Sequence, residues 1–321
     1  MTEKRLAALR RRMAEQGLDA MLVDSSPNRA YLSGFTGTFG ILVVTGEESL
    51  LLTDSRYAEQ AEAQAPAFTV VPVGNEAPAI LAETLARLRP PRTGFENRSV
   101  TVARWREWEE RFSGTTTLVP TEALVEELRL IKDEEEIALL RQAAALADAG
   151  FDFLLDFLRP GRTEREVGLE LEFFLRRQGA SAAGFDFIVA SGPRGSLPHG
   201  VASDRVLNAG ELVTVDYGCF FGGYTSDITR TVAVGEVPER WRTIYEVVRQ
   251  AQEVGVAAVR PGRTGAEVDG EARAVIERAG FGEAFGHGLG HGVGREIHEA
   301  PRLRQGGTEV LRPGMVVTVE P

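Results

Sequence analysis

Short apolar runs and amphipathic stretches alternate over the first part of the chain. The stretch up to about Gln16 spaces its apolar residues as a helix does, and the apolar runs AMLV, GILVVTG and SLLLTD that follow have the length of strands. A fourth run, TVVPVG, precedes the helical pattern AILAETLARLR, and a further helix is predicted from about Ala103 to Phe112. This alternation predicts an α/β domain.

A longer and more charged stretch follows, TEALVEELRLIKDEEEIALLRQAAALADAGFDFLLDFL, and predicts two helices, the second long and amphipathic. Beyond it come more Gly and Pro turns, the strand patterns LVTVDYG, TRTVAVG and MVVTVEP, and all four histidines. We place the domain boundary near Glu126, with one domain at 1–125 and a second at 126–321. The chemistry is expected in the second domain.

The second domain contains an internal repeat. The sequence RPGRT at 159–163 recurs at 260–264, and matches continue at the same offset: Glu166-Val167 with Glu267-Val268, Glu170 with Glu271, and Gly179 with Gly280. Each copy predicts a Pro-Gly turn, a Thr N-cap and a helix that ends at Gly. A chance match of a common pattern is the alternative, but the length of the shared offset favours two related halves with a site between them.

Composition narrows the possible partners and compartments. The 321 residues carry a net charge of −11, which argues against nucleic acid or anionic membranes as partners because phosphate binding draws on clustered Lys and Arg. The single cysteine, Cys219, cannot form an intramolecular disulfide, and the charged N-terminus lacks the apolar core of a signal peptide. We therefore expect a cytoplasmic protein without a membrane span.

Two aspartates lie close together in the second domain. Asp216 ends ELVTVDYG and Asp227 lies in YTSDITRTVAVG, with the predicted turn CFFGG between them. If the two segments pair as a hairpin, Thr214 and Asp216 share one face, as do Thr225, Asp227 and Thr229. Facing carboxylates repel and need a cation or a shared proton, although two solvated aspartates are the simpler explanation of this pair alone.

Three of the four histidines, His287, His291 and His298, fall in the glycine-rich segment FGHGLGHGVGREIHEAP. Glycines let the backbone bend closely around a site that several imidazoles share, whereas ordinary loop histidines are the alternative. The segment fits neither common phosphate-binding motif, which leaves nucleotide binding as a weak alternative. The fourth, His199 in SLPHG, is either a surface residue or part of the same site.

Glu320 lies in the alternating pattern MVVTVEP, whose register places Val316, Thr318 and Glu320 on one face. A carboxylate at the end of a strand means little alone. Joined to two aspartates and a histidine, it completes a mixed oxygen and nitrogen donor set suited to Mn, Co, Zn or Fe.

Together these motifs resemble a known family. LPHG, VDYG with TSDITRT, GHGLGHGVGREIHEAP and TVEP are similar to the proline-specific metallopeptidases of the pita-bread fold, the Xaa-Pro dipeptidase and aminopeptidase P family. NRAYLSGFTGT in the first domain is similar to the creatinase-type N-terminal domain, so the resemblance spans nearly the whole chain. It implies an α/β creatinase-like domain followed by an α+β pita-bread catalytic domain with a pseudo-twofold repeat.

The resemblance also implies a metal site. Its ligands are Asp216, Asp227, His291 and Glu320, holding two divalent ions (Mn, Co or Zn) with Asp227 between them. The family has a fifth ligand, a second bridging glutamate on a later strand, and this chain stops at Pro321. We therefore expect a further C-terminal segment, and weak, mononuclear metal binding if that segment is absent.

The same resemblance assigns roles in catalysis. His199 and His298 hold the substrate and stabilise or protonate the reacting groups, and His287 lines the substrate pocket. Two cations would activate a water that attacks the carbonyl before proline, with Glu320 as the general base. The resemblance further implies a homodimer that acts on short proline-containing peptides.

Arg302 bears on substrate length. It matches the position where some dipeptidases bind the free carboxylate of proline, although a surface arginine explains it equally well. It favours the Xaa-Pro dipeptidase, with an aminopeptidase P that acts on longer peptides as the alternative. Methionine aminopeptidase, a creatinase-like hydrolase and an inactive binding module are more remote alternatives.

Overall fold

The computed structural model describes residues 2–74 and 76–321; Met1, at the start of the first predicted helix, and Asn75 lie outside the described residues. The chain divides into two compact units, residues 1–129 and 130–321. Glu126, where the sequence analysis places the boundary, begins the short helix α6 (Glu126–Arg129) at the end of the first unit.

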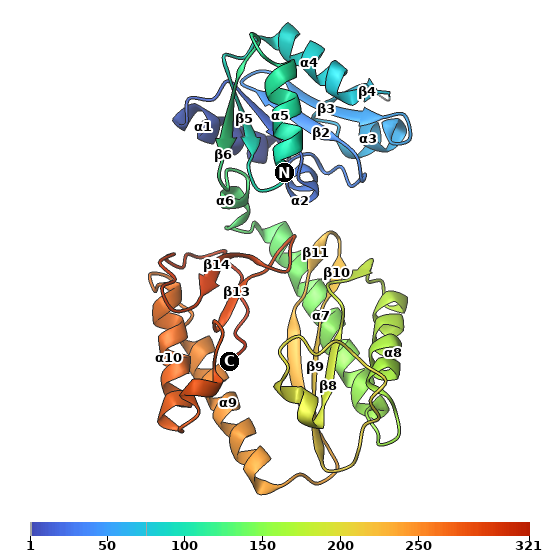
Figure 1. Ribbon diagram of the computed structural model, residues 1–321, viewed down its shortest axis with the longest axis vertical. Helices are drawn as coiled ribbons and strands as arrows, with labels where there is room; N and C mark the ends of the chain where they lie inside the picture. The colour runs from blue at the N-terminus through green and yellow to red at the C-terminus, as the bar shows by residue number, and fades with distance from the viewer. Residues whose placement is uncertain (1, 75) are drawn as a thin grey trace. The chain divides into compact units, whose positions relative to one another are not determined.

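The first unit is built on one six-stranded sheet with the strand order β4-β3-β2-β1-β5-β6 (Figure 1). Its strands are β1 (Ala20–Val23), β2 (Ile41–Thr45), β3 (Ser49–Asp54), β4 (Thr69–Val73), β5 (Arg92–Glu96) and β6 (Thr117–Thr121). Its other helices are α1 (Thr2–Glu15), α2 (Ser26–Ser33), α3 (Ala58–Gln64), α4 (Ala77–Leu88) and α5 (Val102–Arg111). The three central strands β1, β2 and β3 pair antiparallel, and the outer strands join them in parallel.

Helices bury both faces of this sheet. Successive strand residues point to opposite sides, so Met21 and Val23 of β1 pack with α1, α2 and α3 while Leu22 packs with α4 and α5. The predicted α/β domain is confirmed. The sequence analysis missed β5 and β6, because their sequences RTGFE and TLVPT contain no apolar run of strand length.

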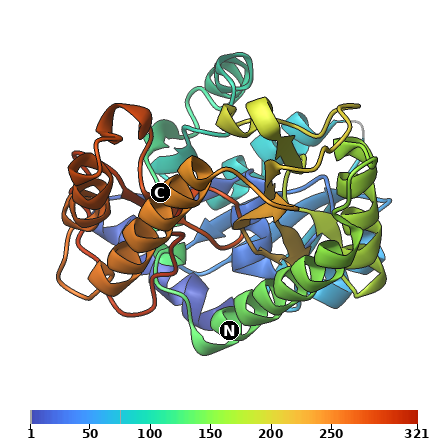
Figure 2. The ribbon, with the colours of Figure 1, turned by 90° about the horizontal axis from the view of Figure 1, so that it is seen from below.

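The second unit pairs helices with short, mostly antiparallel strands. Figures 1 and 2 show α7 and α8 on one side of the unit and α9 and α10 on the other. The helices are α7 (Glu134–Phe157), α8 (Glu164–Arg177), α9 (Glu239–Ala258) and α10 (Gly265–Arg278). The strands are β7 (Ala182–Ala183), β8 (Ile188–Ser191), β9 (Glu211–Tyr217), β10 (Cys219–Phe221), β11 (Tyr224–Thr225), β12 (Ile228–Val234), β13 (Gly290–Gly292) and β14 (Glu299–Leu303). They form the sheets β12-β9-β8, β11-β10-β7 and β13-β14, and each helix pair packs on its own apolar core.

The predicted repeat is confirmed at the start of α8 and α10. Thr163 accepts a hydrogen bond from the Glu166 backbone N–H at 3.1 Å, and Thr264 accepts one from the Glu267 backbone N–H at 3.3 Å. Each glutamate accepts in return from the N–H of its capping threonine, at 2.8 and 2.7 Å. Both helices therefore begin with the same capping box, which supports a duplicated domain.

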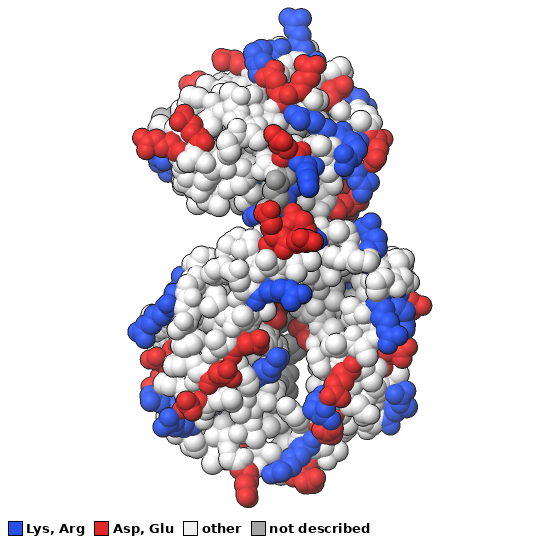
Figure 3. Space-filling view, turned by 180° about the vertical axis from the view of Figure 1, so that it is seen from behind, with Lys and Arg blue, Asp and Glu red and all other residues white. Residues whose placement is uncertain are grey.

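On the face shown in Figure 3, acidic and basic side chains are interspersed over both units, and neither unit has an extended basic patch there. The same view shows the second unit hollowed between its two halves. Among the described residues, no helix combines the length and the apolar character that a membrane crossing requires.

Candidate metal centre

The two aspartates come from one β-ladder. β9 and β12 pair antiparallel, with Asp216 opposite Thr229 and Thr214 opposite Thr231, as the alternation of the sequence predicts. Side chains of opposed residues lie on one face of the sheet, and Thr214 and Thr231 accordingly form a hydroxyl–hydroxyl hydrogen bond of 3.1 Å. Asp227 directly precedes β12, so both carboxylates lie at the same end of the ladder.

The connection between the aspartates differs from the predicted five-residue turn CFFGG. Residues 219–221 form β10, and only Gly222 and Gly223, with φ of 58° and 80°, make the turn to β11. Two adjacent residues with positive φ suit a tight hairpin turn, which glycine permits. The expectation that Thr225 shares a sheet face with Asp227 is wrong, because Thr225 belongs to the separate β11-β10-β7 sheet.

Close backbone contacts position Asp227 at the break between these two sheets. A Cβ on Gly218 would lie 2.0 Å from the Ser226 carbonyl oxygen, so the chain passes there only because residue 218 is glycine. Ser226 accepts the Cys219 backbone N–H with its hydroxyl at 3.1 Å, in place of a ladder bond. Asp227 therefore leaves the interrupted ladder where its side chain can face the second half of the unit.

His291 lies in the middle of β13, between two glycines that are needed for close packing. A Cβ on Gly290 would come within 2.2 Å of the Thr318 carbonyl oxygen, and one on Gly292 within 2.1 Å of that of Ala300. The His291 Nδ1 atom lies 3.0 Å from the Gly292 carbonyl oxygen, which leaves Nε2 to face the carboxylates. The predicted role of glycine around this histidine thus has a direct steric basis.

The expected strand MVVTVEP is not a regular strand. Residues 315–321 run beside β13 with one bridge, from Gly292 to Val317, and hydrogen bonds join the Thr318 N–H to the His291 carbonyl and the Glu320 N–H to the Leu289 carbonyl, both at 2.8 Å. The hydrogen bonds to Leu289 and from Val293 extend this pairing on either side of the three-residue β13. These bonds still fix Glu320 opposite the histidine segment.

Three of the predicted ligands converge. The His291 Nε2 atom lies 3.1 Å from Glu320 Oε1 and 3.5 Å from Asp227 Oδ2, and one donor atom from each side chain falls within 4.8 Å of the other two. His291 is only 8% exposed, so this meeting point is largely shielded from solvent. The three side chains have the donor types and the spacing that a divalent cation requires.

Asp216, the fourth predicted ligand, lies outside this three-residue group, yet its Oδ1 atom is buried and has no hydrogen-bond partner among the described residues. Burial and the Glu320 charge raise the pKa of Asp216 to about 6, against a hydrogen bond from Thr229. Burial, Glu320 and Asp216 raise the pKa of Asp227 to about 7. A cation would satisfy the unpartnered oxygen and relieve the repulsion among the three carboxylates.

One further histidine contacts this group directly, and two others act on it through their charge. The rings of His291 and His298 lie 4.3 Å apart between centroids at an angle of 63°. His199 and His287 are exposed, and their charges lower the pKa values of Asp216 and Glu320, respectively. All four histidines thus bear on one centre.

Arg302 reaches the same centre from β14. It lies opposite His291 in the β13-β14 pair and is partly buried. Burial, with the neighbouring charges of His291 and Arg302, lowers the pKa of His298. Arg302 is therefore placed beside the site rather than on a remote surface.

The sequence analysis missed a second repeat that carries the carboxylates. LNAGELVTVD (207–216) and LRPGMVVTVE (311–320) share the pattern L-x-x-G-x-x-V-T-V-acid, which makes Asp216 and Glu320 equivalent. Thr318, the counterpart of Thr214, donates its hydroxyl to Glu320 Oε1 at 2.5 Å and accepts the His291 N–H at 3.0 Å. The pattern is visible in the sequence once the two segments are aligned on the acid.

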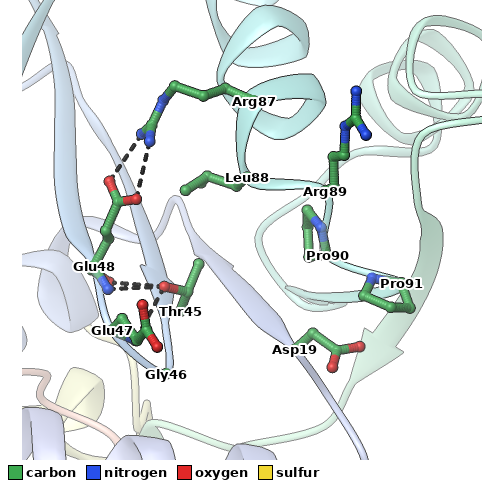
Figure 4. A pocket seen from close by; sticks show the side chains of 10 residues that line it. All are labelled: Asp19, Thr45, Gly46, Glu47, Glu48, Arg87, Leu88, Arg89, Pro90 and Pro91. Atoms are coloured by element: carbon green, nitrogen blue, oxygen red, sulfur yellow. Dashed lines mark hydrogen bonds and ion pairs between the residues drawn. The ribbon is translucent and has the colours of Figure 1, made fainter.

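The first unit has a separate hollow of about 400 Å³, drawn in Figure 4. Arg87 and Glu48 face each other across it with two hydrogen bonds of 2.9 Å, and both side chains are well exposed. None of its ten described lining residues is a histidine or belongs to the predicted site. The candidate chemistry therefore stays with the second unit.

Carboxylates and an imidazole that meet between two related halves, beside an unpartnered carboxylate oxygen, define a metal-dependent hydrolase on a duplicated α+β domain. Residues 138–321 match the model of metallopeptidase family M24, and residues 5–131 match that of the creatinase/prolidase N-terminal domain. The chain belongs to metallopeptidase family M24, a family whose chemistry uses divalent metal ions. The predicted creatinase-like and pita-bread domains are confirmed.

Individual proteins resemble the chain over almost its full length. An Xaa-Pro dipeptidase from Bacillus anthracis has a structure with a TM-score of 0.97 and 43% identity, covering 99% of this chain and 89% of that one. The Xaa-Pro dipeptidase of Pyrococcus furiosus is 36% identical over 99% of this chain and 90% of its own length. The X-Pro aminopeptidase from Thermotoga maritima has a TM-score of 0.89 and 35% identity, covering 96% of this chain and 89% of that one.

Proposed function

We propose that this chain hydrolyses the peptide bond between an N-terminal residue and proline, with Xaa-Pro dipeptides as preferred substrates. The observation that carries the proposal is the convergence of Asp227, His291 and Glu320 beside the unpartnered oxygen of Asp216. The similarity to the Xaa-Pro dipeptidases of Bacillus anthracis and Pyrococcus furiosus supports the substrate class.

We propose Asp216, Asp227, His291 and Glu320 as the ligands of two divalent ions, with manganese, cobalt and zinc as candidates. Three carboxylates and one imidazole suit any of these metals. Bound there, the ions would lower the pKa of a water molecule and polarise the carbonyl group before proline. Elemental analysis of protein reconstituted with each metal tests the stoichiometry, and one ion per chain at saturation in a chain that carries the later bridging glutamate contradicts the dinuclear proposal.

The neighbouring side chains would handle protons and substrate. Glu320, oriented by Thr318, accepts a proton as the general base. His298, whose pKa is lowered by burial and by the charges of His291 and Arg302, would donate a ring N–H to the oxygen that gains charge or to the departing nitrogen. The exposed His199 and His287 would hold the substrate.

Substrate length tests the dipeptidase proposal. Metal-reconstituted protein should release proline from an Xaa-Pro dipeptide with a higher kcat/KM than it cleaves an Xaa-Pro-Xaa tripeptide. We propose that Arg302 binds the free carboxylate of the dipeptide, so Arg302→Gln should raise KM for the dipeptide and leave the tripeptide unaffected. Arg304→Gln, at an exposed position on the same segment, is the control.

Aminopeptidase P activity is the second candidate, because the Thermotoga maritima X-Pro aminopeptidase is also similar over nearly the whole chain. A preference for the tripeptide would overturn the dipeptidase proposal in its favour. If neither peptide is cleaved after addition of Mn, Co or Zn, both proposals fail and a binding module remains.

For compartment and assembly we propose a cytoplasmic homodimer. The one cysteine, Cys219, is buried and free, which fits a reducing compartment. Light scattering at several concentrations tests the dimer, and a monomer at all of them contradicts it.

A further inference from the structure

Each half of the second unit contains a fully buried carboxylate that the proposed metal centre does not use. Glu164 is the first residue of α8 and Asp269 lies on α10, and both side chains are 0% exposed. Acidic side chains are seldom buried so completely without several partners. Their partners show what each carboxylate does.

Glu164 accepts hydrogen bonds from both ends of one loop. Its Oε1 accepts the backbone N–H and the hydroxyl of Ser191 at 2.8 and 2.7 Å. Its Oε2 accepts from Arg194 at 2.5 Å and from the hydroxyl and the N–H of Ser203 at 2.6 and 3.2 Å. The loop between Ser191 and Ser203 carries His199, so this one carboxylate holds both ends of the histidine loop.

Arg194 closes the loop further. Its guanidinium donates to the Val201 carbonyl at 2.9 Å and to the Ser203 hydroxyl at 2.6 Å, in addition to Glu164. His199 therefore lies on a short segment fixed on either side. Burial raises the pKa of Glu164, but the hydrogen bonds from Ser203 and Ser191 lower it more, so the carboxylate keeps its charge.

Asp269 and Arg273 hold the other histidine segment. Arg273 pairs with both oxygens of Asp269, at 2.8 and 3.0 Å, and donates to the carbonyls of Phe285 and His287, both at 2.7 Å. Asp269 Oδ1 also accepts the Leu289 N–H at 3.0 Å. These bonds fix the backbone immediately before His291.

The Leu289 peptide extends this arrangement to a proposed ligand. Its N–H donates to Asp269, and its carbonyl accepts the Glu320 N–H at 2.8 Å. Through Leu289, Asp269 is thus linked to the segment that leads into His291 and to the backbone of Glu320, whereas the hydrogen bonds of Glu164 reach neither.

We propose that Glu164 and Asp269 are positioning residues, one in each half: Glu164 sets the His199 loop, and Asp269 with Arg273 sets the His287–His291 segment and Glu320. The effect on peptide cleavage rests on the proposed function, because it assumes that His199 contacts substrate. The effect on loop order does not depend on the proposed function, and the effect on metal affinity depends only on the proposed ligands His291 and Glu320.

Two nearly isosteric variants test the proposal. An amide offers one acceptor oxygen and one NH2 donor, so Glu164→Gln and Asp269→Asn each turn a donor towards groups that are themselves donors. The controls are Glu172→Gln on α8 and Glu271→Gln on α10, which change more exposed acids of the same helices. Amide hydrogen exchange, Mn²⁺ titration calorimetry, and separate kcat and KM values are measured for each protein.

We expect Glu164→Gln to speed exchange within residues 191–203 and to lower kcat/KM while Mn²⁺ affinity stays as in the wild type. Asp269→Asn should speed exchange within residues 285–291 and weaken Mn²⁺ binding by ~10–100-fold, the range known for partners of metal ligands. Unchanged exchange in the assigned segment, or Mn²⁺ affinity that falls equally in both variants, overturns the proposal.

Milder variants cover the case in which either protein fails to fold. Ser203→Ala removes two of the hydrogen bonds around Glu164 and Arg194, and Arg273→Lys keeps the charge but loses the two-pronged pairing with Asp269. The same two segments should respond, each to its own variant. If the wild type cleaves no Xaa-Pro peptide, the proposed function fails, while exchange and Mn²⁺ binding still decide the positioning roles.

Discussion

The two halves of the metallopeptidase domain share a plan but present their carboxylates differently. In the first half, Asp216 is the last residue but one of a seven-residue ladder between β9 and β12. In the second half, the equivalent Glu320 follows a segment joined to β13 by a single bridge and a few hydrogen bonds. The shared capping boxes and the shared L-x-x-G-x-x-V-T-V-acid pattern give the two halves the same scaffold. The halves differ in how the backbone presents the carboxylate, and this difference bears on the chemistry.

The pKa values of the carboxylates also differ between the two halves. Asp216 and Asp227, from the first half, have raised pKa values because burial and neighbouring carboxylates outweigh the charge of His291 and, at Asp216, the hydrogen bond from Thr229. Burial also disfavours the Glu320 charge, but hydrogen bonds from His291 and Thr318 outweigh it and lower the Glu320 pKa. The aspartates of the first half therefore gain most from a bound cation.

Replacing one aspartate should give the largest effect. Asp227→Asn removes the first-half carboxylate that lies beside His291. We expect the variant to lose metal binding. Its rate of proline release should fall by more than the ~10²–10⁴-fold that is typical of losing one proton-transfer group. Metal content after dialysis and kcat/KM for an Xaa-Pro dipeptide are the measurements. Asp204→Asn, at an exposed aspartate of the same half, should change neither. A variant that retains its metal contradicts the assignment.

A smaller loss should follow from His298→Gln. Its ring contacts that of His291 but is not part of the converging donor group, so metal content should stay as in the wild type. We expect kcat to fall by ~10²–10⁴-fold through loss of a proton donor, with a smaller change in KM. A fall in metal content equal to that of Asp227→Asn would show that His298 acts as a ligand instead.

The metal-free protein should lose stability as pH rises. A carboxylate with a raised folded-state pKa binds more protons when folded, so its stabilising contribution is complete below the unfolded value of about 3.9 and is lost as pH rises through the folded value. For Asp227, whose pKa is raised to about 7, that window runs from about pH 4 to 7. Urea unfolding of chelator-treated protein across this window should show the decline, and Asp227→Asn should flatten it. An unchanged slope in the variant would assign the decline to other groups.

Local patterns predicted more of the structure than long-range pairings did. The capped helix at Thr163 and the β9–β12 pairing follow from turn residues and alternation, both of which can be read within a short window. β5 was missed because its edges are polar and its strand character comes from pairing with β1. The CFFGG segment was assigned a turn of five residues because periodicity does not show where a ladder is interrupted.

The candidate site shows the same division. Residue type and clustering pointed to Asp227, His291 and Glu320, which the fold brings together. Glu164 and Asp269 could not be identified in this way, because a charged residue near the start of a helix is usually exposed and favours the helix for local reasons. Their hydrogen-bond donors include residues far along the sequence, so the burial of these two acids becomes visible only in the folded structure.

The smallest expected effect tests whether the halves are equivalent outside the site. Thr163→Ala and Thr264→Ala each remove one capping hydroxyl in the same geometry, so each should destabilise the protein by about 1 kcal/mol. Urea unfolding of the metal-free variants measures both, and Thr243→Ala, in an exposed stretch of α9 away from its cap, is the control. Equal losses support a common scaffold beneath different chemistry. A cost confined to one cap would mean that the other half holds its helix by packing rather than by the shared cap.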